Sequence, residues 1–116
     1  MESGLARLRR ALADVALPPG SQLGRFPMAD SAAAELMREY EQAHSAAEVS
    51  RAQWLPPSVR QGLDELACQF LEANPLMYCE PAVDYCSDEF LRESRFWADA
   101  RELAAEVLRM LAEADR

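Results

Sequence analysis

Residues 88–114 read DEFLRESRFWADARELAAEVLRMLAEA and hold the clearest periodic pattern of the chain. Apolar side chains recur there every three or four residues, and charged side chains occupy the opposite side. This spacing is typical of an α-helix with one buried face. Ser87 stands in the N-cap position, so the pattern predicts one helix over residues 88–114. The apolar positions are Phe96, Ala100, Leu103, Val107, Leu111 and Ala114, flanked by Phe90, Trp97, Ala104 and Leu108.

Three further helices are predicted upstream, each with apolar residues at the same spacing. The first lies within residues 1–17, the second covers about 30–52 and the third covers 58–73. Prolines and glycines interrupt the pattern between them, so residues 18–29 are predicted to form a loop and residues 75–86 an irregular segment. The apolar faces contain Leu5, Leu8, Leu12 and Val15; Ala33, Leu36, Met37, Tyr40, Ala43 and Ala47; and Val59, Leu63, Leu66, Ala67 and Phe70.

The composition points to the same fold class. Lys, Ile and Thr do not occur, Ala and Leu dominate, and half of the 116 residues are apolar. Strands favour β-branched residues, whereas Ala, Leu, Arg and Glu are good helix formers. We therefore expect an all-α fold, a compact bundle of four amphipathic helices with an irregular loop between the third and fourth. A chain of this length forms a single domain, residues 1–116.

Charge is unevenly distributed along the chain. The net charge is −8, made up of +2 over residues 1–29 and −10 over residues 30–116. We expect the mildly basic N-terminal helix to pack on a three-helix acidic body, residues 30–116. An acidic body disfavours nucleic acid as a partner, and no apolar run is long enough to span a membrane. Without an apolar leader segment the predicted location is cytoplasmic, and arginine in place of every lysine indicates a bacterial source with GC-rich coding.

His44 is a polar residue near the middle of the apolar face predicted for residues 30–52. Glu41 and Glu48 border it, and Arg51 lies two turns further on. One interpretation is a polar pocket in which Glu and His hold a metal ion. The other is a histidine hydrogen-bonded to a neighbouring glutamate, with Arg51 at the rim.

The three cysteines allow several interpretations. Cys68, Cys79 and Cys86 together with His44 make up a Cys₃His set of the kind that binds zinc, although no two cysteines have the close spacing of a zinc knuckle. Alternatively, Cys79 and Cys86 form a disulfide, or all three are small apolar fillers of the core. Cys68 falls on the polar face of its helix, so either the 75–86 loop covers it or it is an open thiol. Its acidic neighbours disfavour a catalytic role, because they raise a thiol pKa.

The predicted function is that of a non-enzymatic interaction module, such as an adaptor, cognate inhibitor, chaperone or regulator. No glycine-rich phosphate loop or convincing catalytic triad is present in the sequence, and no cofactor is expected. Leu76, Met77, Tyr78 and Tyr85 in the irregular segment are typical interface anchors, and the acidic surface favours a basic protein partner. Homodimerisation through helix 88–114 is a further expectation. The alternative function is a small metal- or ligand-binding domain built on His44 and the cysteines.

Overall fold

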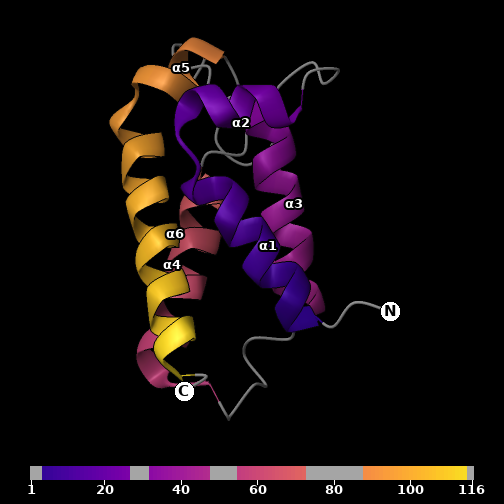
Figure 1. The fold of residues 1–116 in the computed structure, drawn as a ribbon, viewed down its shortest axis with the longest axis vertical. Helices are drawn as coiled ribbons and strands as arrows, with labels where there is room; N and C mark the ends of the chain where they lie inside the picture. Colours follow the sequence, from indigo (N-terminus) through magenta and orange to yellow (C-terminus); the bar gives the residue numbers. More distant parts are fainter. Residues whose placement is uncertain (1–3, 27–31, 48–54, 73–87, 115–116) are drawn as a thin grey trace.

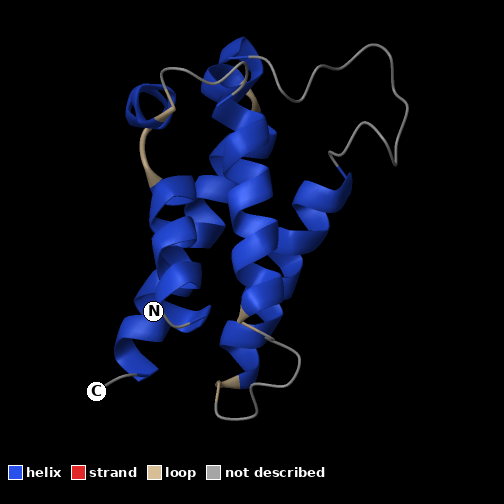
Figure 2. Cartoon of the chain, turned by 90° about the vertical axis from the view of Figure 1, so that its right-hand side faces the viewer, coloured by secondary structure: helices blue, strands red, loops and turns tan. Residues whose placement is uncertain are grey.

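The computed structural model describes residues 4–26, 32–47, 55–72 and 88–114, and every regular element in these ranges is a helix. The all-α prediction is confirmed. Four long helices form the body, and two short ones lie at one end of it (Figures 1 and 2). Their bounds are α1 Gly4–Ala16, α2 Pro19–Arg25, α3 Ala32–Ala46, α4 Pro57–Glu72, α5 Asp88–Glu93 and α6 Arg95–Ala114.

The four long helices surround one core. α1 packs against α3 and α6, and α4 packs against the same two helices from the other side, so the cyclic order is α1, α3, α4, α6. In Figure 1, α1 crosses in front of the bundle at an angle while α4 and α6 stand behind and beside it. The expected packing of the N-terminal helix on the rest of the chain is therefore observed.

The core consists of the apolar faces that the periodicity predicts. Leu8, Leu12 and Val15 of α1 are fully buried. On α6 the buried stripe passes through Trp97, whereas Phe96 is only partly buried, so the helix is rotated slightly from the predicted orientation. The other large buried side chains include Tyr40, Phe70, Leu36, Leu63, Leu66, Leu91 and Leu111.

A glycine allows α4 and α6 to approach closely. A Cβ atom added to Gly62 would lie 2.6 Å from Cγ2 of Val107 on α6. Glycine costs about 1 kcal/mol relative to alanine inside a helix. At this position the cost is offset by the tighter packing of the two helices.

The segment 18–29, predicted to be a loop, instead contains the short helix α2. Pro19 occupies the beginning of this helix, where a proline is tolerated because the first N–H groups have no partner inside a helix. Gln22 of α2 is fully buried. Its Nε2 donates hydrogen bonds to the carbonyl oxygens of Val15 (2.7 Å) and Asp14 (3.3 Å) in the last turn of α1, where carbonyl groups lack some of their helical partners.

The helix predicted over residues 88–114 is interrupted at Ser94. The Ser94 hydroxyl accepts a hydrogen bond of 3.1 Å from the Trp97 amide, as an N-cap does, and α6 begins at Arg95. In an uninterrupted helix the Leu91 carbonyl would accept from the Arg95 amide. Here Nη2 of Arg101 donates to it, and Nε of Arg101 donates to Oε1 of Gln22 at 3.0 Å. One arginine thus links α6 to α5 and to α2.

Candidate functional site

The residues predicted to anchor a partner lie outside the described part of the chain. These are Leu76, Met77, Tyr78 and Tyr85, and Cys79 and Cys86 of the predicted metal set fall in the same segment. Glu48 and Arg51, predicted to border His44, are also outside it. Of the proposed sites, the structure therefore describes His44, Glu41 and Cys68.

His44 lies at the α3–α4 interface and not in the centre of the apolar face. Its side chain is 24% exposed, and Nε2 is 3.0 Å from Oδ1 of Asp64 on α4. The ring packs beside Tyr40 with 5.9 Å between the ring centroids. The predicted hydrogen bond to a neighbouring glutamate is not seen for Glu41, which is exposed, and Glu48 lies outside the described residues; the carboxylate that bonds His44 comes from α4. The helical spacing of one segment does not reveal a partner twenty residues away.

Cys68 is exposed, with a free thiol. It stands one turn beyond Asp64 on the polar face of α4, as predicted. Within residues 4–26, 32–47, 55–72 and 88–114, no three metal-binding side chains come together. Of the Cys₃His set, the structure thus describes Cys68, which is exposed, and His44, which is partly exposed.

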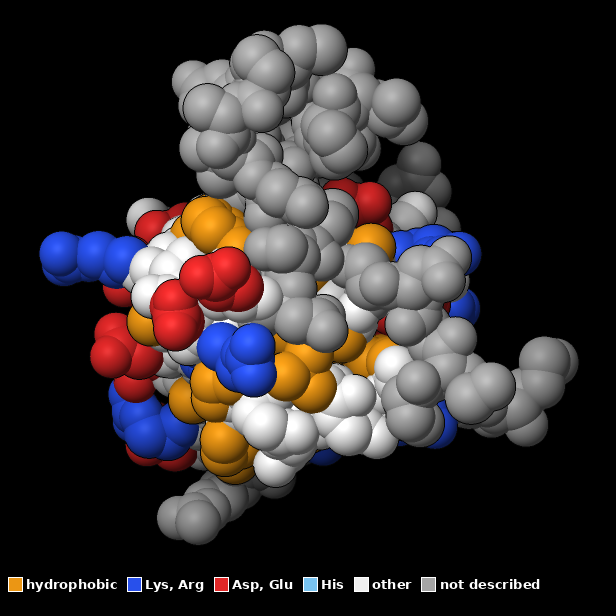
Figure 3. All heavy atoms as spheres, turned by 90° about the horizontal axis from the view of Figure 1, so that it is seen from above, with side chains coloured by type: hydrophobic (Ala, Val, Ile, Leu, Met, Phe, Trp, Pro, Cys, Tyr) orange, Lys and Arg blue, Asp and Glu red, His pale blue; other side chains and the backbone are white. Residues whose placement is uncertain are grey.

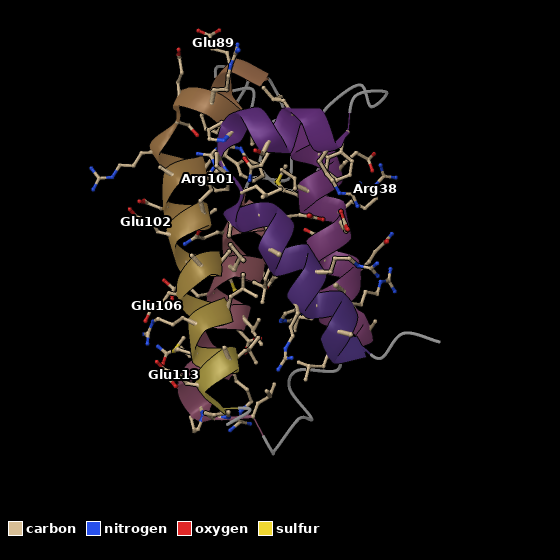
Figure 4. All side chains as sticks on the ribbon, in the orientation of Figure 1. Arg38, Glu89, Arg101, Glu102, Glu106 and Glu113 are labelled. Carbon is tan, nitrogen blue, oxygen red and sulfur yellow. The ribbon has the colours of Figure 1, made fainter. Side chains whose placement is uncertain are left out.

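The outer face of α6 carries a row of carboxylates. Asp99, Glu102, Glu106 and Glu113 are all exposed. Figure 4 shows Glu102, Glu106 and Glu113 along one edge of the helix, pointing away from the bundle. From Asp99 to Glu113 the row is about 21 Å long, at 1.5 Å per helical residue. We call these four residues the α6 acidic row.

Arginines compensate the row only in part. Arg109 donates to Glu106 and, at 2.7 Å, to Glu113. The hydrogen bond from Arg109 lowers the pKa of the Glu106 carboxyl below its ordinary value, so Glu106 is ionised at neutral pH. Arg95 is 93% exposed and stands 3.9 Å from Asp99. Among the described residues, Glu102 has no ion-pair partner.

Alanines adjoin the acidic row. Ala98, Ala105 and Ala112 recur every seven residues on α6 and are exposed. Positions seven apart lie on nearly the same line of a helix. Their short side chains leave the backbone of α6 open to close approach by another chain. The face therefore combines negative charge with a shallow apolar strip.

Charge differs between the first two helices and the last two. α1 and α2 contain four arginines and one carboxylate, whereas α5 and α6 contain four arginines and seven carboxylates. α3 and α4 contain two arginines and six carboxylates, so the excess of acidic side chains is spread over all the helices from α3 to α6.

The end of the bundle formed by α2 and α5 has a different surface. Seen from that end, the described surface mixes apolar, acidic and basic side chains (Figure 3). Leu23 of α2 and Phe90 of α5 are only partly buried. α5 follows directly on the segment in which Tyr78 and Tyr85 were predicted to anchor a partner.

In comparisons with known proteins, the chain matches no family model, no curated protein and no solved structure. None of the helices in the described ranges is both long enough and apolar enough to cross a membrane. The function is inferred below from the residues of this chain alone.

Proposed function

We propose that the protein is a non-enzymatic interaction module that binds a basic protein partner along the outer face of α6. The observation that carries this proposal is the α6 acidic row, four exposed carboxylates on one rigid helix that neighbouring arginines neutralise only in part. A row about 21 Å long matches a partner element of similar length, such as a helix with Arg or Lys on one face.

The exposed alanines define how close that partner lies. A helix that packs over Ala98, Ala105 and Ala112 can place its own backbone near α6, because small residues at an interface allow close approach. Charged groups on either side then set the register. Electrostatic attraction of this kind accelerates association and weakens as salt is added.

The apolar face of α6 is not part of this surface. Trp97, Ala100, Ala104, Val107 and Leu111 are buried inside the chain's own bundle. Homodimerisation stays a prediction, and it would have to use other residues. The anchoring role of Leu76, Met77, Tyr78 and Tyr85, which precede α5 in the sequence, also stays a prediction.

The test compares two triple variants of the full chain with the same change in charge. One carries Glu102→Gln, Glu106→Gln and Glu113→Gln on the α6 acidic row. The matched control carries Glu41→Gln, Glu65→Gln and Glu93→Gln, which are also exposed glutamates. Circular dichroism first establishes that both variants retain the helix content of the parent chain.

Each chain is then used to capture proteins from the native cell extract, and captured proteins are purified and titrated individually. We expect a basic protein that binds the parent and the control at low salt, and that the α6 variant binds at least about tenfold more weakly, the equivalent of roughly 1.4 kcal/mol. A partner that binds all three chains equally, or one whose binding does not respond to salt, would contradict the proposal.

A further inference from the structure

A pocket of about 330 Å³ opens on the surface between the end of α2 and the outer side of α3. It lies away from the α6 acidic row: Figure 4 shows Arg38, which lines the pocket, on the opposite side of the bundle from Glu102 and Glu106. Pockets that hold small molecules begin at about 300 Å³, so this one suits a ligand of amino-acid size. The residues that line it are Arg25, Phe26, Glu35, Arg38, Glu39 and Gln42.

The two arginines of the pocket already have partners. Arg38 forms an ion pair with Glu35, one turn earlier on α3. Arg25 lies with its guanidinium over the ring of Phe26, 5.2 Å from the centroid, and its Nε is 3.7 Å from Oδ1 of Asp14. An anionic ligand would have to compete with these carboxylates for both guanidinium groups.

The carboxyl groups of the pocket are less well satisfied. Glu39 lines the pocket, and Asp14 of α1 lies near enough for its charge to act on Glu39. Asp14 is 9% exposed, and its Oδ2 accepts no hydrogen bond from an amide, guanidinium or hydroxyl group of the described residues. Since Arg25 pairs with Asp14 and Arg38 with Glu35, Glu39 is the lining carboxyl group without an ion pair among the described residues.

The electrostatics agree with this geometry. Burial and, next, the nearby charge of Asp14 raise the pKa of Glu39 above its ordinary value of 4.5. Arg25 and Arg10 act in the opposite direction and do not cancel the increase. A carboxyl group whose pKa is raised for these reasons lies where a positive charge would be favourable.

We propose that this pocket binds a small organic cation whose guanidinium or primary ammonium group donates hydrogen bonds to Glu39, with Phe26 against its apolar part. The cation binds the ionised form of Glu39, so any proton that Glu39 holds passes to solvent on binding. Aromatic faces attract such cations, and charge-assisted hydrogen bonds orient them. The site is independent of the partner surface on α6.

Calorimetric titration of the full chain with agmatine, which carries one guanidinium and one ammonium group, tests the proposal. We expect saturable binding at a single site. Repeating the titration in two buffers of different ionisation enthalpy measures the released proton. Binding should strengthen as pH rises through the pKa of Glu39. Besides Asp14, the charged groups that act on Glu39 or line the pocket with it are Arg10, Arg25, Glu35 and Arg38.

Matched variants locate the site. Glu39→Gln is expected to weaken agmatine binding by about tenfold or more, as loss of one charge-assisted hydrogen bond does. Glu41→Gln makes the same change on an exposed residue of the same helix outside the pocket and should leave binding unchanged. Phe26→Leu keeps every charge and should weaken binding less. It remains informative if Glu39→Gln lowers the stability of the fold.

The source of the cation is distinguished by a second ligand, an end-blocked glycyl-arginyl-glycine peptide. Tighter binding of this peptide than of agmatine identifies the side chain of a protein partner as the occupant, and the reverse identifies a free small molecule. The proposal is overturned if agmatine shows no saturable binding, if Glu39→Gln and Glu41→Gln bind it equally, or if sodium acetate binds in its place. The triple variant of the α6 acidic row should bind agmatine normally, so failure of one proposal does not decide the other.

Discussion

The hydroxyl group of Tyr40 donates a hydrogen bond of 2.7 Å to the backbone carbonyl of Leu63, and this bond joins α3 to α4 inside the core. Tyr40 is fully buried, and burial, followed by the nearby Asp64, raises its pKa far above the ordinary value. The hydroxyl therefore keeps its proton and acts as a donor throughout the physiological pH range.

Tyr40→Phe removes this bond and leaves the ring contacts with Phe70 in place. The Leu63 carbonyl remains part of the backbone of α4 after the substitution. We therefore expect the free energy of unfolding to fall by only about 1 kcal/mol. Urea denaturation followed by circular dichroism measures it. Ser45→Ala, which removes an exposed hydroxyl from the same helix, serves as the control. An unchanged midpoint for Tyr40→Phe would mean that the bond contributes nothing to stability.

Gly62→Ala should destabilise the protein even though alanine favours helices. The new Cβ would lie 2.6 Å from Val107, whose branched side chain cannot turn aside easily, so α4 and α6 must separate. Overpacking costs about 1–3 kcal/mol, against about 1 kcal/mol gained in helix propensity. Gly24→Ala is the control: nothing lies within 4 Å of its added Cβ, and we expect it to raise the melting temperature. A more stable Gly62→Ala protein would show that the two helices are not in close contact.

Gln22→Met keeps the length of the side chain and removes its hydrogen bonds to Val15 and Arg101. Buried groups left without partners cost about 1–3 kcal/mol each, so we expect at least about 2 kcal/mol of destabilisation. Gln61→Met, at an exposed position of α4, should change stability little. The double variant with Arg101→Met should lose less than the sum of the two single variants, because the residues share one network. Strict additivity in urea denaturation would argue against that network.

Stability should depend on pH through Glu39. Its pKa is raised in the folded chain, so its contribution is fully present below the ordinary value of 4.5 and is lost as pH rises through the folded pKa. Glu39→Gln abolishes this titration. We therefore expect the variant to gain stability relative to the parent chain as the pH increases from about 4 to about 7. Urea midpoints of parent, Glu39→Gln and the exposed control Glu41→Gln measure the difference, and parallel curves for all three would exclude the effect.

The buried faces of the long helices could be predicted from the sequence because a period of 3.6 residues determines which side chains share a face. Leu8, Leu12 and Val15 illustrate this. The choice between Phe96 and Trp97 as the more buried ring depends on how α6 is rotated against its neighbours, and the period alone does not reveal it. The interruption at Ser94 likewise depends on Arg101 reaching the Leu91 carbonyl, a contact between two turns that only the folded chain brings together.

The candidate sites also differ in how far they could be predicted from the sequence. The α6 acidic row could be predicted, because the residues of an amphipathic helix that do not belong to its buried face are exposed. The pocket of Glu39 is not, since Asp14, Arg25 and Glu39 come from three helices. Its one local signal is Asp14, a carboxylate at a position of α1 that lies beside the apolar face. His44 could be singled out in the sequence, because it is a polar residue near an apolar stripe. Its partner Asp64 could not, because the packing of α3 against α4 brings the two residues together.

The pairing of α1 with α6 has a consequence for how the protein is made. The ribosome synthesises α1 long before α6, and until then Leu8, Leu12 and Val15 lack one of the two long helices against which α1 packs. Gln22 likewise cannot accept its hydrogen bond from Arg101 until the seventy-nine residues that follow it have been synthesised. The nascent chain therefore exposes apolar side chains of α1 until α6 has been synthesised. A chain stalled at Ser94 would leave these side chains exposed, and molecular chaperones recognise such surfaces.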